Sequence, residues 1–311
     1  KQKYKVAANP DSELMVTAGA MEALMCAFQT IVNPGDEVIM TSPGFSSHIQ
    51  QILLAGGTPK FLPLIEEKNW AIDLAALPKL ITPKTKAIVL CSPCNPTGSI
   101  FSKKELTAIA EIILKRDIML ITDEPYHFLT FNNKSPYSLV SDKRLRHNRI
   151  SCFSFSKEFV MTGYRVGYIF AENNLLRQIL KVHDATIVSA PRPSQVAAIA
   201  ALKGNRDCVE DLKKTLENRR NLMCSYLDKM SKWFSYAPPL GSYYVFPKFL
   251  PAHNDIKQVA MDMLFEAKIA VVPGTAFGPA GDHHLRFCFG CTEDDIKIGM
   301  ERLHKWLQKK Y

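Results

Sequence analysis

Several short runs of uninterrupted apolar residues, separated by longer helical patterns, constrain the fold of this chain more than any other feature. A strand that is buried on both faces carries such a run, whereas a strand with one solvent-exposed face alternates apolar and polar residues. The runs predict strands at residues 37–40, 87–91, 118–122, 150–155 and 166–170. Burial on both faces is typical of a mostly parallel sheet that helices cover on both sides.

Helical patterns lie between these runs. Ser102 and Glu105 have the spacing of a capping box, and Leu106, Ile109 and Ile113 then form one apolar stripe. The alternation of strands and helices predicts an α/β fold with a doubly wound, mostly parallel sheet.

The sequence changes in character after Gly204. A long charged segment at residues 207–232 predicts one helix, and shorter strands are expected at 242–246, 269–272 and 285–289. The last helix begins at a cap on Thr292 and carries on one face Ile296, Met300, Leu303 and Leu307. We therefore expect a large domain at residues 1–206, then a linking helix and a smaller α+β domain at residues 207–311.

The 311 residues, 47% of them hydrophobic, suffice for two cores. No stretch has the apolar length of a membrane-spanning helix, and the first residues do not resemble a signal peptide. The eight cysteines lie mostly in apolar runs such as LCSPC and FCFGC, which favours reduced, buried thiols in a cytoplasmic protein. Cys91/Cys94 and Cys288/Cys291 have C-x-x-C spacing, but the pairs lie far apart, so we interpret them as core residues and expect no metal.

The net charge of +9 comes from Lys and Arg residues that are spread along the chain, with no recognised nucleic-acid motif. We therefore expect neither a nucleic-acid nor a membrane partner. A basic surface of this kind favours small anionic substrates and cofactors.

Polar and small residues gather where the predicted strands end, which is where a doubly wound sheet binds its ligands. A turn at Gly19 opens a helix, as phosphate-binding turns do. Asn95 follows a strand in a loop of Pro and Gly, and Asp123 follows an apolar run where a carboxylate needs a cationic partner. Taken singly, each also fits a structural role: an ordinary turn, an Asx-turn or an exposed strand-end carboxylate.

Lys157 is the most informative of these residues. It ends a predicted strand, with Ser154 and Ser156 beside it and Arg165 eight residues further on. A lysine in such a place can have a lowered pKa, as Schiff-base chemistry requires. An isolated strand-end lysine would more often lie on the surface with its charge in water.

The order of five motifs adds to this interpretation: NPTG at 95–98, DEPY at 123–126, SFSK at 154–157, VVPGTAFG at 271–278 and LRFCFG at 285–290. This ordered set resembles the class I/II aminotransferases of the aspartate aminotransferase type, which belong to the fold type I enzymes that use pyridoxal 5'-phosphate. The resemblance implies an enzyme that moves an amino group between an L-amino acid and a 2-oxo acid such as 2-oxoglutarate. It also implies a large domain that binds the cofactor and a homodimer with shared active sites.

The resemblance assigns catalytic roles to three residues. Lys157 looks like the lysine that carries the cofactor and then moves a proton, and Asp123 like the carboxylate that keeps the pyridine nitrogen protonated. Tyr126, together with Asn95, matches the residues that hydrogen-bond the cofactor's phenolic oxygen.

Other positions match the residues that bind the cofactor's phosphate and the substrate. The phosphate group would contact Gly19, Ala20, Met21, Ser154 and Arg165. Phe45 aligns with the aromatic residue that stacks on the ring, and His48 could support Asp123 from behind. Arg286 looks like the clamp for the substrate α-carboxylate, with Asn95 beside it.

Family members carry an N-terminal arm and part of the small domain before the segment that matches residues 13–17, and this chain has only a short stretch there. We therefore expect the first part of the small domain to be missing. The tyrosine that a neighbouring subunit donates to the phosphate in the family has no counterpart in this chain.

Substrate choice and reaction type stay open. Met21 and Gln195 stand where some relatives that use aspartate have cations, which favours a neutral or aromatic amino acid. Arg192 lies in the same loop as Gln195 and keeps aspartate open. The same scaffold also carries Cβ–S lyases and, fused to a DNA-binding domain, modules of transcription regulators.

Overall fold

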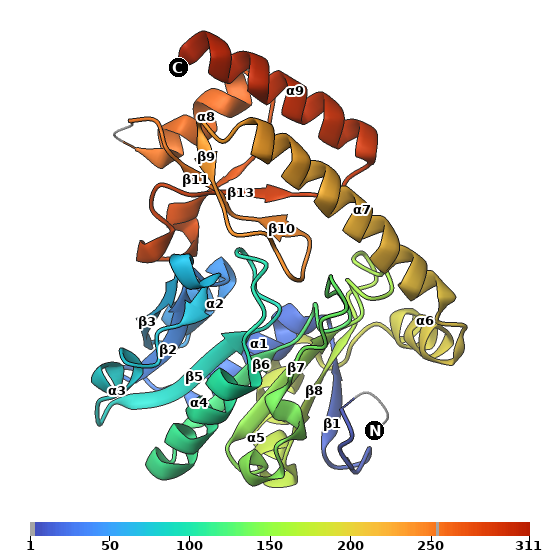
Figure 1. Ribbon diagram of the computed structural model, residues 1–311. Coiled ribbons are helices and arrows are strands. Elements are labelled where there is room, and N and C mark those ends of the chain that lie inside the picture. Colours follow the sequence, from blue (N-terminus) through green and yellow to red (C-terminus); the bar gives the residue numbers. More distant parts are fainter. Residues whose placement is uncertain (1–3, 253–254) are drawn as a thin grey trace.

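The computed structural model of the chain describes residues 4–252 and 255–311. An eight-stranded sheet forms its larger part, in the order β1-β8-β7-β6-β5-β2-β3-β4 (Figure 1). The strands are β1 (Leu14–Thr17), β2 (Glu37–Ser42), β3 (Thr58–Ile65), β4 (Ala71–Ile72), β5 (Thr85–Cys91), β6 (Met119–Asp123), β7 (Arg149–Ser154) and β8 (Gly167–Ala171). β3, β2, β5, β6 and β7 are parallel neighbours, and β4, β8 and β1 are antiparallel to theirs. The predicted mostly parallel sheet is confirmed.

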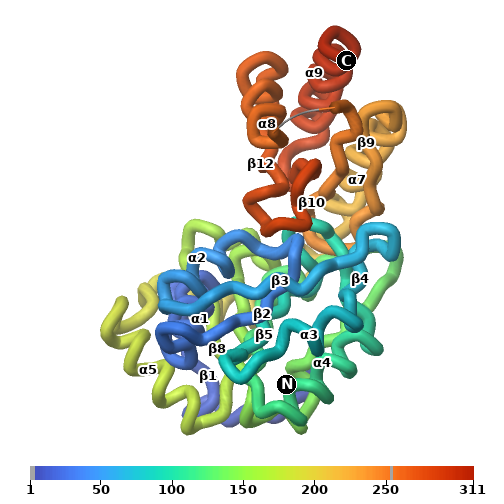
Figure 2. The backbone as a smooth tube through the Cα atoms, turned by 90° about the vertical axis from the view of Figure 1, so that its left-hand side faces the viewer, coloured from blue at the N-terminus to red at the C-terminus, as the bar shows by residue number. Residues whose placement is uncertain are grey.

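The central strands bury both faces, as their uninterrupted apolar runs predict. Val38 and Met40 of β2 lie in one hydrophobic cluster, while Ile39 between them lies in another. The first cluster includes residues of helices α1 (Ala20–Ile31) and α5 (Asn173–Ile187), and the second includes residues of α4 (Lys103–Arg116). Figure 2 shows α1 and α5 on one side of the sheet and α3 (Leu77–Leu80) and α4 on the other.

Local signals in the sequence account for the clearest helix boundaries. Ser102 and Glu105 form the predicted capping box at the start of α4, and Leu106, Ile109 and Ile113 are buried. The remaining helices are α2 (Ser46–Leu54), α6 (Arg192–Lys203), α7 (Asp207–Lys229), α8 (Ile256–Phe265) and α9 (Glu293–Lys310). α9 starts with a capping box on Thr292 and buries all four predicted residues.

The C-terminal part has its own small sheets. One has the order β10-β13-β12, from Tyr244–Val245, Leu285–Cys288 and Val272–Pro273, and the other pairs β9 (Phe234–Ser235) with β11 (Lys248–Phe249). The strand predicted at 269–272 is wrong except at its last residue. The N–H of Ile269 bonds the carbonyl of Met263, and its side chain packs on the core instead of pairing in a sheet.

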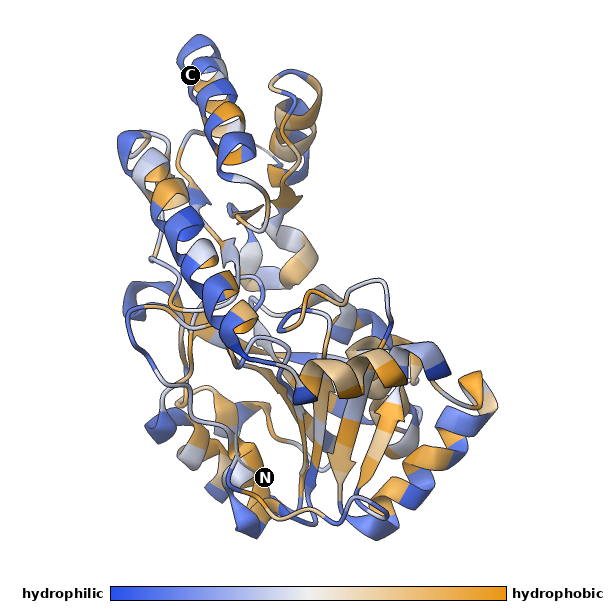
Figure 3. Ribbon diagram, turned by 90° about the vertical axis from the view of Figure 1, so that its right-hand side faces the viewer, coloured by the Kyte–Doolittle hydropathy of each residue, from blue (hydrophilic) through white to orange (hydrophobic). Residues whose placement is uncertain are grey.

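The long helix α7 runs from beside α6 to the C-terminal part, where it packs with α9 (Figure 1). Leu216, Met223 and Leu227 of α7 share one hydrophobic cluster with Met300 and Leu303 of α9. In Figure 3 the strands of the large sheet are mostly orange, whereas the C-terminal helix is largely blue. The division into domains at residues 206 and 207 stays a prediction. No helix in the described residues has the length and apolarity to cross a membrane.

The cysteines are all reduced, but the expectation of mostly buried thiols holds only in part. Four are buried, Cys224 is half-buried, and three are exposed: Cys208, Cys288 and Cys291. Cys288 was expected inside an apolar run, but β13 buries only one face, and its side chain lies on the other.

Candidate active site

The carboxyl ends of the strands in the large sheet and the edge of the small sheet enclose a cavity of about 340 Å³. Its lining contains nearly all of the predicted site residues: Ala20, Met21, Phe45, Asn95, Asp123, Tyr126, Ser154, Lys157, Arg165 and Arg286. Gly19 is not in the lining, but it lies directly against Arg165. These residues come from segments far apart in the sequence, and the fold brings them to one place.

One end of the cavity is the turn between β1 and α1. Gly19 has φ of +82°, and a Cβ there would lie 2.6 Å from Nη2 of Arg165, so the position requires glycine. Its own N–H bonds the carbonyl of Thr17, at 2.8 Å. The first N–H groups of α1, on Ala20 and Met21, have no partner within the helix, since they begin it. This end therefore offers backbone donors and the positive end of a helix dipole to an anion.

Two side chains complete this anion-binding end. Arg165 donates from Nη1 to the carbonyl of Thr162 at 2.9 Å and from Nη2 to that of Ala18 at 3.4 Å, which holds its guanidinium over the turn. The hydroxyl of Ser154 accepts a bond from the N–H of Ser156 at 3.1 Å, which leaves its hydrogen free to donate. A charged fork beside backbone N–H groups suits a phosphate.

Asp123 lies deep in the cavity at the end of β6 and is 3% exposed. Its Oδ2 lies 3.2 Å from Nε2 of His48, and the ring of His48 packs edge-on against Phe45, with centroids 5.3 Å apart. Oδ1 has no hydrogen-bond partner in the described part of the chain. A buried carboxylate oxygen without a donor is costly, so this geometry calls for an N–H or cationic group from a ligand.

Lys157 lies half-buried between these groups. Burial disfavours the ammonium form and lowers the pKa of Lys157 below its usual range, and the positive charges of Arg165 and Arg286 lower it further. Cys288 and, less strongly, Asp123 act in the opposite direction without reversing the shift. The Nζ of Lys157 lies 5.6 Å from the ring centroid of Tyr243. Such a lysine is more often a free amine, which is the nucleophilic form.

The other end of the cavity is built around Arg286, from β13. Its Nη1 donates to Oδ1 of Asn95 at 3.0 Å, and its guanidinium lies 4.4 Å from the ring centroid of Tyr244 and 5.0 Å from that of Phe277. Its Nε has no partner in the part of the chain that the structure describes. The guanidinium is thus held by aromatic rings while part of it remains free to bind a carboxylate.

Tyr244 is a site residue that the sequence did not reveal. Its hydroxyl lies 3.2 Å from that of Tyr126, and burial raises the pKa of Tyr126 well above its usual range. In the register of the small sheet, Tyr244 pairs with Cys288, two residues from Arg286. The only signal in the sequence is the stretch GSYYVF. It predicts a strand, but it does not predict that the side chain of Tyr244 lies beside Tyr126.

Gln195 and Arg192, considered for substrate choice, lie at the start of α6 and outside the lining of this cavity. Gln195 donates from Nε2 to the carbonyl of Ala190 at 2.9 Å. Arg192 is exposed.

The chain is similar to known proteins in both sequence and structure. The family model described as aminotransferase class I and II matches residues 1–303. A putative aminotransferase, YugH, of Bacillus subtilis is 36% identical, over 99% of this chain and 79% of the relative. An aspartate aminotransferase of Pyrococcus abyssi is 33% identical, over 100% of this chain and 80% of the relative. The crystal structure of an aromatic aminotransferase from Pyrococcus horikoshii superposes with a TM-score of 0.95, at 32% identity, over 100% of this chain and 83% of that one.

Proposed function

This chain belongs to the family of class I and II aminotransferases, and on that premise we propose that it uses pyridoxal phosphate, carried on Lys157, to transfer amino groups from neutral or aromatic amino acids to a 2-oxo acid. That it is an aminotransferase, and that members of its family use this cofactor, follows from the family itself. The substrates and the role of each residue are our proposal. The observation that carries it is the unpartnered Oδ1 of buried Asp123 in the same cavity as a lysine of lowered pKa.

The residues of the cavity fit this cofactor. A pyridinium N–H supplies the donor that Oδ1 of Asp123 lacks, and a phosphate suits the helix start beside Arg165. Tyr126 and Asn95 offer hydrogen bonds to a phenolic oxygen, and Phe45 offers its ring face. When it is bound, the cofactor acts as an electron sink for the carbon that loses its proton.

The residues of the protein hold the cofactor, orient the substrate and move the proton. Asp123, oriented by His48, would keep the ring nitrogen protonated, and the turn at Gly19 with Arg165 and Ser154 would hold the phosphate. Arg286 binds the α-carboxylate of the amino acid or 2-oxo acid, which orients the Cα–H bond. Lys157, as a free amine, would take the proton from Cα and then, as the ammonium, deliver it to C4′ of the cofactor.

The charges in the cavity support neutral or aromatic substrates. Among the described residues that line it, the cations are Lys157, Arg165 and Arg286. Once two of these serve the cofactor and Arg286 serves the α-carboxylate, that lining holds no further cation for a side-chain carboxylate. The 2-oxo acid, 2-oxoglutarate in our proposal, presents its α-carboxylate to Arg286, and its second carboxylate would then lie toward solvent, where water can hydrate it. Relatives include proteins named as aspartate and as aromatic-amino-acid aminotransferases, so both substrate classes must be tested.

Steady-state kinetics with Asp, Ala, Met and Phe, each with 2-oxoglutarate, test the substrate proposal. We expect kcat/KM to be higher for Phe, Met or Ala than for Asp, and a strong preference for Asp would overturn the proposal. Release of pyruvate and ammonia from cystathionine without any acceptor would instead indicate a Cβ–S lyase.

The absorption spectrum tests the cofactor assignment. Added pyridoxal phosphate should give a visible band with the wild-type chain, and Lys157→Ala should abolish that band. Lys104→Met, which changes an exposed lysine, serves as the control and should keep it. A wild-type spectrum identical to that of the free cofactor would contradict the proposal.

The domain division, the homodimer and the cytoplasmic location remain proposals as well. Exposed apolar side chains on α6, at Val196, Ile199 and Leu202, offer a surface that another subunit could cover. Light scattering would show a particle of twice the chain mass if the chain forms the homodimer.

A further inference from the structure

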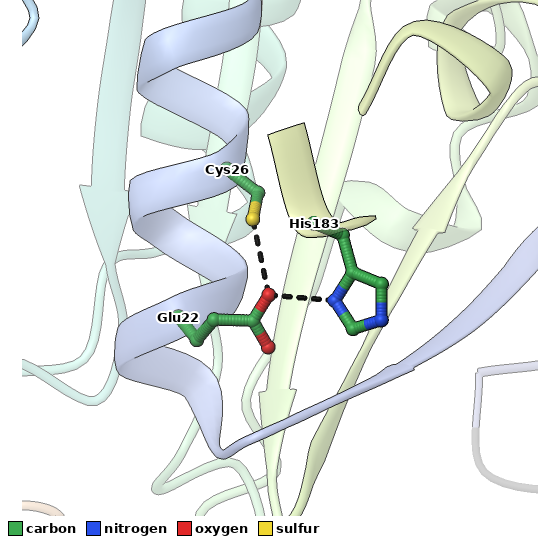
Figure 4. Close-up of side chains that lie close together, drawn as sticks. All are labelled: Glu22, Cys26 and His183. Atoms are coloured by element: carbon green, nitrogen blue, oxygen red, sulfur yellow. Dashed lines mark hydrogen bonds and ion pairs between the residues drawn. The ribbon is translucent and has the colours of Figure 1, made fainter. Parts of the chain in front are cut away.

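Outside the cavity, the fold builds a second polar cluster directly beneath the anion-binding turn. Glu22 lies in the first turn of α1, Cys26 one turn later, and His183 on α5 (Figure 4). Oε1 of Glu22 lies 2.8 Å from Nδ1 of His183 and accepts the thiol of Cys26 at 3.1 Å. The side chains of Glu22 and His183 are 9% and 5% exposed, so this is a nearly buried hydrogen-bonded pair.

The second oxygen of the carboxylate reaches the turn. Oε2 of Glu22 accepts the N–H of Ala18 at 2.6 Å, and the carbonyl of Ala18 accepts a hydrogen bond from Arg165 at 3.4 Å. Gly19 and Thr17 close the turn with two further bonds between them. Glu22 thus holds the N–H of Ala18 and Arg165 its carbonyl, two residues before the first N–H groups of α1.

The packing of α1 against α5 does not explain why a polar pair lies between these helices. α1 and α5 already meet through apolar side chains, including Ala23, Ala27, Leu176 and Ile179. A buried polar pair contributes little net stability compared with apolar residues of the same size, because its polar groups lose their hydration. A negative charge at a helix start also competes with a bound phosphate for the same dipole. The pair therefore needs a reason other than stability.

A metal ion does not supply this reason. The ligand atoms of Glu22, Cys26 and His183 lie within 4.8 Å of one another. However, the thiol of Cys26 donates a hydrogen bond to Glu22, and burial raises the pKa of Cys26 above its usual range. Oε1 of Glu22 already satisfies both the thiol of Cys26 and Nδ1 of His183, so the three groups form a closed hydrogen-bonded set without an ion.

We propose that Glu22 and His183 are a positioning pair that fixes the phosphate-binding turn, with His183 orienting the carboxylate of Glu22 so that its other oxygen holds the N–H of Ala18. The pair does not touch the cofactor. It sets the direction of the N–H groups of Ala20 and Met21, and so acts on the phosphate alone. This role rests on the proposed use of pyridoxal phosphate.

Two ligands separate this role from a general one. Pyridoxal phosphate and pyridoxal share the ring and the aldehyde, but only the first carries the phosphate. Removing the pair should therefore weaken the binding of pyridoxal phosphate and leave the binding of pyridoxal unchanged. We expect Glu22→Gln and His183→Ala to weaken binding of pyridoxal phosphate roughly tenfold, the equivalent of one hydrogen bond to a charged group. The affinity for pyridoxal should stay within about twofold. His183→Asn, which keeps a donor near the position of Nδ1, should restore most of the affinity.

Glu13 provides a matched control at the opposite end of β1. It is also a buried carboxylate, and it accepts the N–H of Asn9 at 2.8 Å and pairs with Arg146. Glu13→Gln should affect stability in the same way as Glu22→Gln without separating the two ligands.

The affinities are measured by titrating the purified full chain with each ligand and following absorbance and tryptophan fluorescence. If Glu22→Gln and His183→Ala bind pyridoxal phosphate as tightly as wild type, or lose affinity for both ligands equally, the positioning role is wrong. If the wild-type chain binds neither ligand, the proposed function itself fails.

Discussion

The two ends of the cavity are built in different ways. The cofactor end is formed by strand ends and a helix start of the large sheet, and Thr17, Asp123 and Ser154 are each the last residue of a strand. The substrate end depends on a meeting between Asn95, in a loop of the large sheet, and Arg286, on a short strand of the C-terminal part. The cofactor end is therefore fixed by one extended hydrogen-bonded sheet, whereas the substrate end depends on how two parts of the chain pack together.

This difference separates binding of the cofactor from binding of the substrate. Substitutions at the cofactor end should change the chemistry or the affinity for the cofactor, and those at the substrate end should change KM for the amino acid. Four expectations test this separation.

The largest effect is expected at Asp123. Asp123→Asn keeps the shape but removes the charge that holds a proton on the ring nitrogen. We expect kcat to fall by roughly a hundred- to a thousandfold, about the cost of breaking a buried charged pair. KM for the amino acid should change little, since Arg286 is untouched. Steady-state kinetics on the cofactor-saturated variant measure both values, and a fall in kcat of less than about tenfold would argue against this role for Asp123.

A pair of Arg→Lys variants compares the two ends directly. A lysine cannot reproduce the planar fork of an arginine on a carboxylate or phosphate. Arg286→Lys should raise KM for the amino acid roughly tenfold or more and leave the affinity for the cofactor unchanged. Arg165→Lys should lower the affinity for the cofactor by a similar factor, with little change in KM. Both constants are measured for both variants. If each variant changed both constants equally, the two ends would not be separable.

Tyr244 joins the two ends, and its effect should be smaller. Tyr244→Phe keeps the ring against Arg286 but removes the hydroxyl that lies 3.2 Å from that of Tyr126. Loss of one neutral hydrogen bond corresponds to a roughly three- to tenfold lower kcat. The pH at which the cofactor's visible band titrates should shift, whereas KM should stay constant. Tyr236→Phe, which removes a hydroxyl that bonds Asp228 outside the cavity, serves as the control, and an equal shift in both variants would show that the contact with Tyr126 is not the cause.

The smallest effect concerns stability. The lowered pKa of Lys157 means that the unfolded chain binds more protons than the folded one between the folded pKa and the unfolded value of 10.5. The cost of holding the ammonium is complete below the folded pKa and disappears as the pH rises to the unfolded value. Without cofactor, Lys157→Met should therefore raise the free energy of unfolding most at low pH, with a gain that shrinks at alkaline pH. Urea unfolding at several pH values measures this, with Lys104→Met as the control. A gain independent of pH would point to packing instead.

The same comparison shows what the sequence could reveal. Asp123 and Lys157 each follow an apolar run, so a local pattern placed them at a strand end, and the edge of a mostly parallel sheet then gathers them. Arg286 has no such local signal, and only the family resemblance assigned it a role. Tyr244 and the pair Glu22–His183 depend on contacts between segments that are distant in the sequence, which no local pattern encodes. The strand predicted at residues 269–272 is wrong at residues 269–271 for a similar reason, because Ile269 and Val271 pack on the core and no strand in the described residues pairs with them.

The central claim is that Lys157 carries the cofactor. Its most direct test is to incubate the wild-type chain with pyridoxal phosphate, reduce it with borohydride, digest it and locate the modified lysine by mass spectrometry. We expect the pyridoxyl group on the peptide that contains Lys157, and on no other lysine in stoichiometric amount. A modification located on another lysine, or no stable adduct at all, would contradict the account.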